Sequence, residues 1–101
     1  MKDTSTINLE DFETCLGQTF MVTPEHGDGV ELELFQVKPL GTINPEAVTH
    51  RPFSVLFRGP LEPMLAQQMY RVENSNFGEY SLFLVPIGPD ESGMVYDATF
   101  N

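Results

Sequence analysis

The sequence predicts an all-β domain: a small antiparallel barrel, or a strongly bent sheet, of six strands with a short helix near the N-terminus. In most segments apolar and polar residues alternate with a period of two, which is the pattern of half-buried strands. Turn-forming residues separate these segments at spacings typical of all-β domains. A chain of 101 residues fits one domain, 1–101, with residues 1–6 as a flexible tail. A two-sheet β-sandwich is the alternative arrangement.

The helix is expected within INLEDFETCLG, residues 7–17. Asn8 is a good N-cap, and two acidic residues follow it at the positive end of the helix dipole. Ile7 and Phe12 have the spacing of a hydrophobic staple, and Gly17 is a natural stop. A helix this short is marginal alone, so we expect it to plug one open end of the barrel. Its apolar residues fall on one face: Leu9, Phe12 and Leu16.

Six segments are expected to be strands: 18–23, 30–38, 53–59, 69–74, 80–87 and 94–100. In the second segment the alternation slips by one residue at Leu34–Phe35, which predicts a β-bulge or sharp bend, or a change to burial on both faces. The fifth segment, YSLFLVPI, is almost continuously apolar, as expected of a strand covered on both faces. We expect Pro86 near its end or at an unpaired position. Short turns predict hairpins between strands 1–2, 4–5 and 5–6, and longer connectors join the rest.

Charge and length exclude several classes of function. Fifteen acidic residues face five basic ones, which gives a net charge of −10. Such a surface repels phosphate groups, which argues against binding to nucleic acid or to membranes. It leaves a basic partner open, although solubility alone also accounts for it. No apolar run approaches the roughly 18 residues that cross a bilayer, and no signal-peptide core is present, so we expect a cytoplasmic location with signal-independent export left open.

The sequence carries no recognised catalytic or metal-binding motif. Cys15 with His26 or His50 could form a thiol-nucleophile set, but its place beside Leu16 favours a small buried apolar residue. The two histidines lack zinc-site spacing, and the acidic turns lack the pattern of a calcium loop. We therefore expect no catalytic residue, no cofactor and no metal.

The stretch RPFSVLFRGP, residues 51–60, places two of the five basic residues at the ends of one strand. Arg58 follows a run that should be buried, and an unpaired buried charge is costly. We therefore expect a structural ion pair with an acid on a neighbouring strand, Glu73 or Glu79. The alternative is an anion or carboxylate site at Arg58. Arg51 is interpreted as a loop residue that holds the long connector.

Four segments carry a resemblance to a known family: FETCLGQTF (12–20), RPFSVLFRGP (51–60), LFLVPIG (82–88) and YDATF (96–100). The pattern FExxLGxxF … RPFSxLFRGP … LFLVPIG … YxAxF resembles that of a family of small bacterial domains of unknown function. The resemblance implies no catalytic residues, because the family carries no established activity. Domains of this kind lie beside tail-collar or fibre-type proteins in bacterial genomes, which implies an accessory or assembly role in a phage-tail-like or fibre-type system.

Two functions remain. The first is a non-enzymatic protein-binding or assembly module whose partner could be the product of a neighbouring gene. Strand addition at a sheet edge would be its natural mode of binding. An adaptable apolar patch would come from three residues of the second connector and the strand after it: Met64, Leu65 and Met69. The second is a small-ligand pocket or small enzyme at a barrel mouth lined by Arg58, Tyr70 and Tyr96. Homo-oligomer formation is left open.

Overall fold

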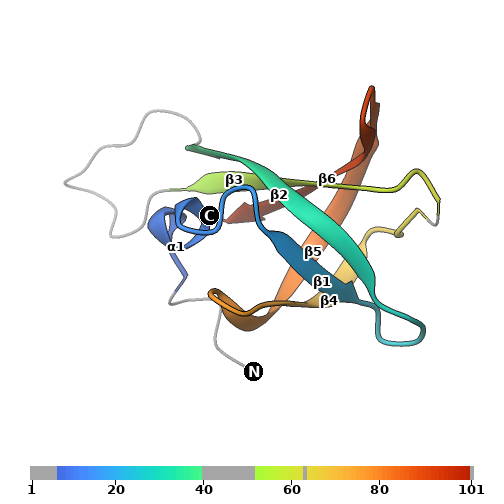
Figure 1. Cartoon of the computed structure of the whole chain (residues 1–101), viewed down its shortest axis with the longest axis horizontal. Coiled ribbons are helices and arrows are strands. Elements are labelled where there is room, and N and C mark those ends of the chain that lie inside the picture. Colours follow the sequence, from blue (N-terminus) through green and yellow to red (C-terminus); the bar gives the residue numbers. More distant parts are fainter. Residues whose placement is uncertain (1–6, 40–51, 63, 101) are drawn as a thin grey trace.

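The computed structural model describes residues 7–39, 52–62 and 64–100, and it shows a closed antiparallel barrel with one short helix. The predicted barrel is therefore confirmed over the sandwich. Figure 1 shows the helix at one end of the barrel, beside the end of the last strand, and the connector after the third strand at the other end. The elements are α1 (Leu9–Glu13), β1 (Thr19–Thr23), β2 (Val30–Pro39), β3 (Phe53–Gly59), β4 (Gln68–Asn74), β5 (Gly78–Asp90) and β6 (Gly93–Phe100).

The strands follow the order β1-β2-β3-β6-β5-β4 around the barrel, and every neighbouring pair is antiparallel. Hairpins join β1 to β2, β4 to β5 and β5 to β6, as the short turns predict. The barrel closes where Met21–Thr23 of β1 pairs with Arg71–Glu73 of β4. Closure matters for function because a closed sheet presents no long edge to another strand.

The predicted β-bulge in β2 is confirmed. The pairing register with β3 shifts between Leu34 and Gln36, so Phe35 is the extra residue. Leu34 stays in the core, and Phe35 turns outward, where the guanidinium carbon of Arg58 lies 3.9 Å from the centre of its ring. The slip in alternation is thus the sequence signature of the bulge.

A second irregularity, in β5, was not predicted. The register with β6 shifts between Pro86 and Gly88, and Pro86 lies opposite Tyr96 inside the strand. β5 continues to Asp90, beyond the predicted end of the strand at residue 87. The irregularity accommodates the proline, because a proline has no N–H to donate to the ladder.

α1 plugs one end of the barrel, as predicted. The Asn8 side chain accepts a hydrogen bond from the Asp11 N–H, and the Asp11 carboxylate accepts one from the Asn8 N–H, which forms a capping box. Phe12 is fully buried, and its ring centroid lies 4.6 to 5.8 Å from those of three other phenylalanines: Phe53, Phe77 and Phe100. The single core cluster extends from here through the barrel interior.

The helix is shorter than predicted, and the predicted burial of one of its residues, Leu16, is wrong. α1 ends at Glu13, before the predicted stop at Gly17. Leu16 is therefore not on the helical face of Phe12, and its side chain is 51% exposed. Cys15 takes the buried position instead, as its interpretation as a small apolar residue predicts.

The expectation that β5 is covered on both faces is also wrong. Leu82 and Leu84 point into the core, but Phe83 is 47% exposed and Ile87 is 56% exposed. The described chain places no second layer over this outer face, so the outward residues of β5 meet solvent. Two apolar residues therefore lie on the surface of the barrel where the sequence predicts burial.

Candidate functional site

The connector between β3 and β4 closes the end of the barrel opposite α1. The Leu65 N–H donates a hydrogen bond of 2.8 Å to the Tyr96 hydroxyl, and the Tyr70 hydroxyl donates one to the Ala66 carbonyl. Burial raises the pKa of Tyr70 above its ordinary value. Leu65 itself is buried in the core. Both tyrosine hydroxyls therefore hold the connector in place.

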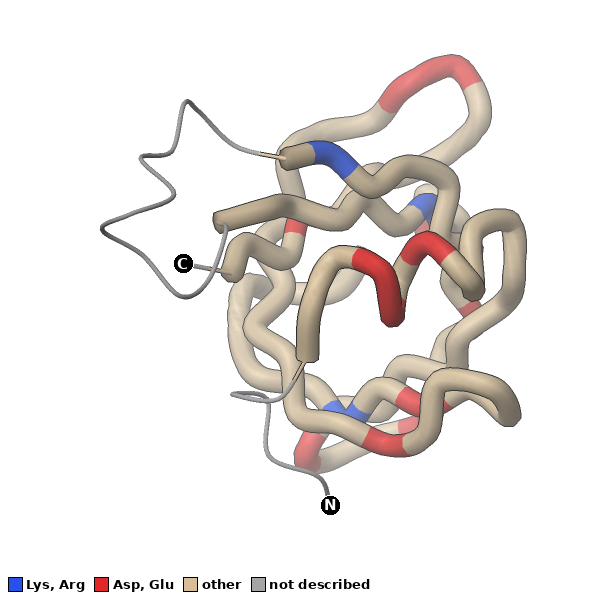
Figure 2. Tube along the Cα trace, turned by 90° about the vertical axis from the view of Figure 1, so that its left-hand side faces the viewer, with Lys and Arg blue, Asp and Glu red and all other residues tan. Residues whose placement is uncertain are grey.

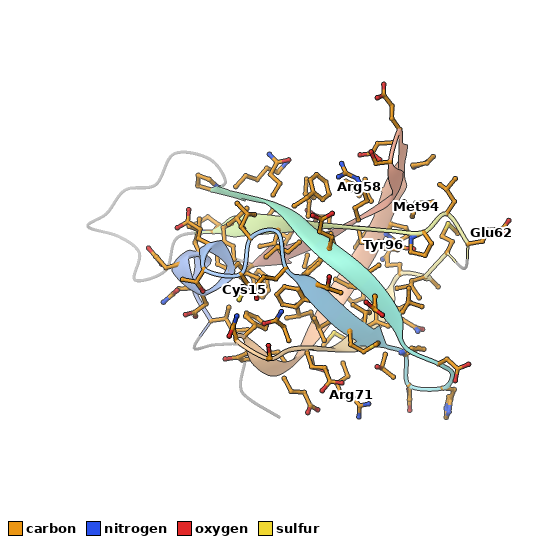
Figure 3. The ribbon with its side chains drawn as sticks, viewed as in Figure 1. Cys15, Arg58, Glu62, Arg71, Met94 and Tyr96 are labelled. Carbon is orange, nitrogen blue, oxygen red and sulfur yellow. The ribbon has the colours of Figure 1, made fainter. Side chains whose placement is uncertain are left out.

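The structure does not bring Arg58 together with Tyr70 and Tyr96, so the predicted shared pocket is wrong. Phe57 pairs with Tyr96, and Arg58 pairs with Val95. Successive residues of a strand point to opposite faces, so Arg58 lies outside the barrel while the buried Tyr96 lies inside it. Figure 3 shows both side chains.

Arg58 forms an ion pair, but its partner is Asp90 and not Glu73. The Arg58 Nε lies 3.1 and 3.2 Å from the two carboxylate oxygens of Asp90, and Nη2 also donates to one of them. Glu73 lies on β4, which is not adjacent to β3, and Glu79 lies 3.9 Å from Arg71. Arg58 therefore joins β3 to the far end of the β5–β6 hairpin in a structural role.

The pair makes stability depend on pH. Hydrogen bonds from Arg58, and then from the Ser92 N–H, lower the pKa of Asp90 below its ordinary value. A carboxylate with a lowered folded-state pKa stabilises the fold above its unfolded pKa of about 3.9, and this contribution is lost as the pH falls through the folded pKa.

Asp90→Asn should therefore be less stable than the wild type at pH 7, with a difference that shrinks near pH 3. The asparagine oxygen can still accept the Ser92 N–H, so the change removes the ion pair with Arg58 and keeps this turn contact. Urea unfolding at the two pH values measures the difference. Asp28→Asn, in the exposed β1–β2 turn, is the matched control. A difference for Asp90→Asn that is the same at both pH values would contradict this assignment.

A continuous surface runs along the outer faces of β4 and β5. On these strands Tyr70, Val72 and Leu82 point inward and are buried, so the alternate residues point outward. We call these outward register pairs the β4–β5 outer ladder: Met69 with Phe83, Arg71 with Ser81, and Glu73 with Glu79. The ladder is apolar at one end and acidic at the other.

The acidic end of the ladder continues across two more strands. Met21 of β1 pairs with Glu73 on one side and with Glu31 of β2 on the other. Four adjacent strands thus carry one transverse row, here called the acidic row: Glu31, Met21, Glu73 and Glu79. The row lines a shallow surface hollow of about 460 Å³. Figure 2 shows how acidic positions outnumber basic ones around the barrel.

The family of the chain is known from its sequence. A family model described as Domain of unknown function (DUF6916) matches residues 7–100. The chain belongs to this family. The match spans α1 and all six strands, so the DUF6916 segment and the barrel coincide. Comparisons with curated proteins and with solved structures found no match. The predicted resemblance to a family of unknown function is confirmed.

In this DUF6916 domain, the predicted apolar patch is present only in part. Met64 is 58% exposed and Met69 is 52% exposed, but Leu65 is buried and cannot contribute to the surface. Phe83 lies directly opposite Met69 and was missed, because its strand was interpreted as covered on both faces. The exposed apolar group at the connector end of the DUF6916 barrel is the cross-strand pair Met69 and Phe83, with the exposed connector residues Leu61 and Met64 that precede Met69 in the chain. Ile87 is exposed farther along β5.

The described part of this DUF6916 domain offers little for catalysis or metal binding. Cys15 is buried just before β1, whereas His26 is exposed just after it, so these two residues do not form a thiol-nucleophile set. His50 and the 40–51 part of the long connector lie outside the described residues. Within the described ranges, no three His, Cys, Asp or Glu side chains are placed to hold a metal ion. No helix in these ranges is long and apolar enough to cross a membrane.

Proposed function

We propose that this DUF6916 domain is a non-enzymatic protein-binding module that serves the assembly of a larger bacterial system of the phage-tail-like or fibre type. The observation that carries the proposal is the exposed apolar group around the connector end of the barrel. Met69 and Phe83 form a cross-strand pair in which each side chain is about half exposed. Apolar side chains gathered at one place on a surface mark interaction sites, whereas single ones are ordinary.

The partner would bind to this outer face of the barrel. Strand addition, the mode expected from the sequence, needs a free sheet edge, and β1 to β6 form a closed barrel. The side chains on the outer face of the barrel are therefore the surface that is left for a partner to bind. Each side chain is about half exposed, so burying the rest of one methionine or phenylalanine would contribute about half of the value for full burial, or ~0.7–1.5 kcal/mol, to binding. Methionine suits such a surface because its flexible thioether adapts to the partner.

Four of the residues considered for a ligand pocket or for catalysis have structural roles. The hydroxyls of Tyr70 and Tyr96 hold the connector, and the guanidinium of Arg58 is paired with Asp90. Cys15 is buried against the end of the barrel. These contacts support a binding role over an enzymatic one.

Met64→Asp/Met69→Asp should abolish co-purification of the partner from the native host, where a product of a neighbouring gene is the first candidate. The aspartates would remove the apolar contact with the partner, and their carboxylates would have to be desolvated on binding. We therefore expect at least a tenfold loss of affinity for the partner. The measurement is quantitative pulldown with the tagged domain. Unfolding should change by less than about 0.5 kcal/mol, because both side chains are on the surface.

Leu16→Asp is the matched control, because Leu16 is equally exposed but lies beside α1 at the opposite end. The proposal is wrong if the double variant retains the partner, or if Leu16→Asp loses it equally. Analytical ultracentrifugation of the wild type decides between a different protein and a second copy of the chain as the occupant of this face.

A further inference from the structure

We propose that the partner is a basic segment, with an apolar side chain on Met69 and Phe83 and a lysine or arginine on the acidic row. This inference rests on the proposed function and adds the chemistry of the partner. The two ends of the β4–β5 outer ladder are four residues apart on each strand. At about 3.3 Å per residue, this separation is about 13 Å.

The charges of the ladder favour a cation. Glu73 and Glu79 lie directly opposite each other, an arrangement that destabilises a sheet. Among the described residues, Arg71 is the one that forms an ion pair with any of the three glutamates of the row, and its distance to Glu79 is 3.9 Å. A basic group from a partner would relieve this repulsion. A second copy of the chain would add to it, because each copy carries a net charge of −10.

The shape of the acidic row suits a long basic side chain. Met21 lies in the middle of the row, 37% exposed, with Glu31 on one side and Glu73 on the other. The methylene stem of a lysine or arginine can lie on the methionine while its charged head reaches the carboxylates. The hollow of about 460 Å³ around these residues has room for such a side chain.

The ladder also sets a spacing for the partner. In an extended peptide, residues i, i+2 and i+4 point to the same face, and i and i+4 are about 13 Å apart. An apolar residue at i and a basic residue at i+4 therefore match the two ends of the ladder. Arg71 lies between these ends and would repel a basic residue at i+2. The expected pattern is apolar, any, non-basic, any, basic.

Selection of a displayed library of random 12-residue peptides on the immobilised wild-type domain tests the inference. We expect enrichment of this pattern in either chain direction, with Leu, Met or Phe four positions from Lys or Arg. A synthetic peptide of the enriched pattern should bind at least tenfold more weakly to Glu73→Gln/Glu79→Gln and to Met69→Asp. Its affinity should also fall as NaCl is raised from about 0.05 to 0.5 M, since salt screens exposed charges.

Glu13→Gln/Glu91→Gln removes two charges elsewhere on the surface and is the matched control. An equal loss of affinity in this control would show that the peptide responds to the net charge of the domain and not to the acidic row, which would overturn the inference. Enrichment of neutral or acidic peptides would overturn it as well. If the native partner is lost by Met64→Asp/Met69→Asp and retained by Glu73→Gln/Glu79→Gln, the binding module stands and the basic partner does not. Loss of repulsion should keep the glutamine variant folded, which circular dichroism checks.

Discussion

Phe12→Ala should lower the free energy of unfolding by about 3–5 kcal/mol, the usual cost of removing a buried phenylalanine ring. The Phe12 side chain is 0% exposed, and it packs against Phe53, Phe77 and Phe100. The loss is a large share of the 5–15 kcal/mol that stabilises a typical domain. α1 has five residues and cannot persist without this contact, so the barrel should open at this end. Urea unfolding followed by circular dichroism measures the change.

Leu16→Ala provides the control within the same segment. Leu16 is 51% exposed, and its truncation should change the free energy of unfolding by less than about 0.5 kcal/mol. Similar losses in the two variants would contradict the assignment of Phe12 as the plug of the barrel. An unchanged unfolding midpoint for Phe12→Ala would show that α1 is not part of the cooperative unit.

Local patterns were sufficient to predict the strands and the bulge. The inward residues of β4 follow from alternation, because a barrel with one core buries every second residue. The slip at Leu34–Phe35 predicts the bulge for the same reason: the inward positions change from even numbers up to Leu34 to odd numbers at Val37, and an extra residue between them is needed for this change. The helix cap at Asn8 is likewise a local feature, since it involves residues three positions apart.

Contacts between distant segments could not be predicted in this way. The partner of Arg58 depends on the strand order, and the sequence does not state that β3 lies beside β6 and apart from β4. Asp90 lies beyond the predicted end of the strand at residue 87, although β5 extends to it and brings it to Arg58. The exposure of Phe83 depends on whether a second layer covers β5, and an apolar strand alone does not distinguish the two cases.

The candidate site likewise contains residues that local sequence patterns predict and residues that only contacts between distant segments bring together. Met64 and Met69 were found because two methionines close together in the sequence, at the end of a connector and the start of a strand, are a recognisable local signal. Leu65 belongs to the same signal but packs inside the barrel, since the backbone around it bonds to Tyr96. The acidic row was missed, because its three glutamates come from different strands and meet only through the register.

Gly93→Ala should lower the free energy of unfolding by about 3 kcal/mol or more. Gly93 has φ +149, a conformation that residues with a side chain adopt only at a cost of about 1–3 kcal/mol. In addition, a Cβ at this position would overlap the carbonyl oxygen of Gly59. Relief would require the backbone of β3 to move away from β6, where Gly59 pairs with Met94. Chemical unfolding of the variant, followed by circular dichroism, measures the loss.

Gly88→Ala separates the overlap from the backbone strain. Gly88 has φ +117, but no atom lies within 4 Å of the position that its Cβ would occupy. This variant should therefore lose only the strain contribution of about 1–3 kcal/mol. The Gly93 variant should be the less stable of the two, because overlap with backbone atoms cannot be relieved by a side-chain rotation. Equal stabilities would mean that β3 and β6 do not approach each other closely at Gly59, and that the pairing which positions Arg58 beside Asp90 is looser than the structure shows.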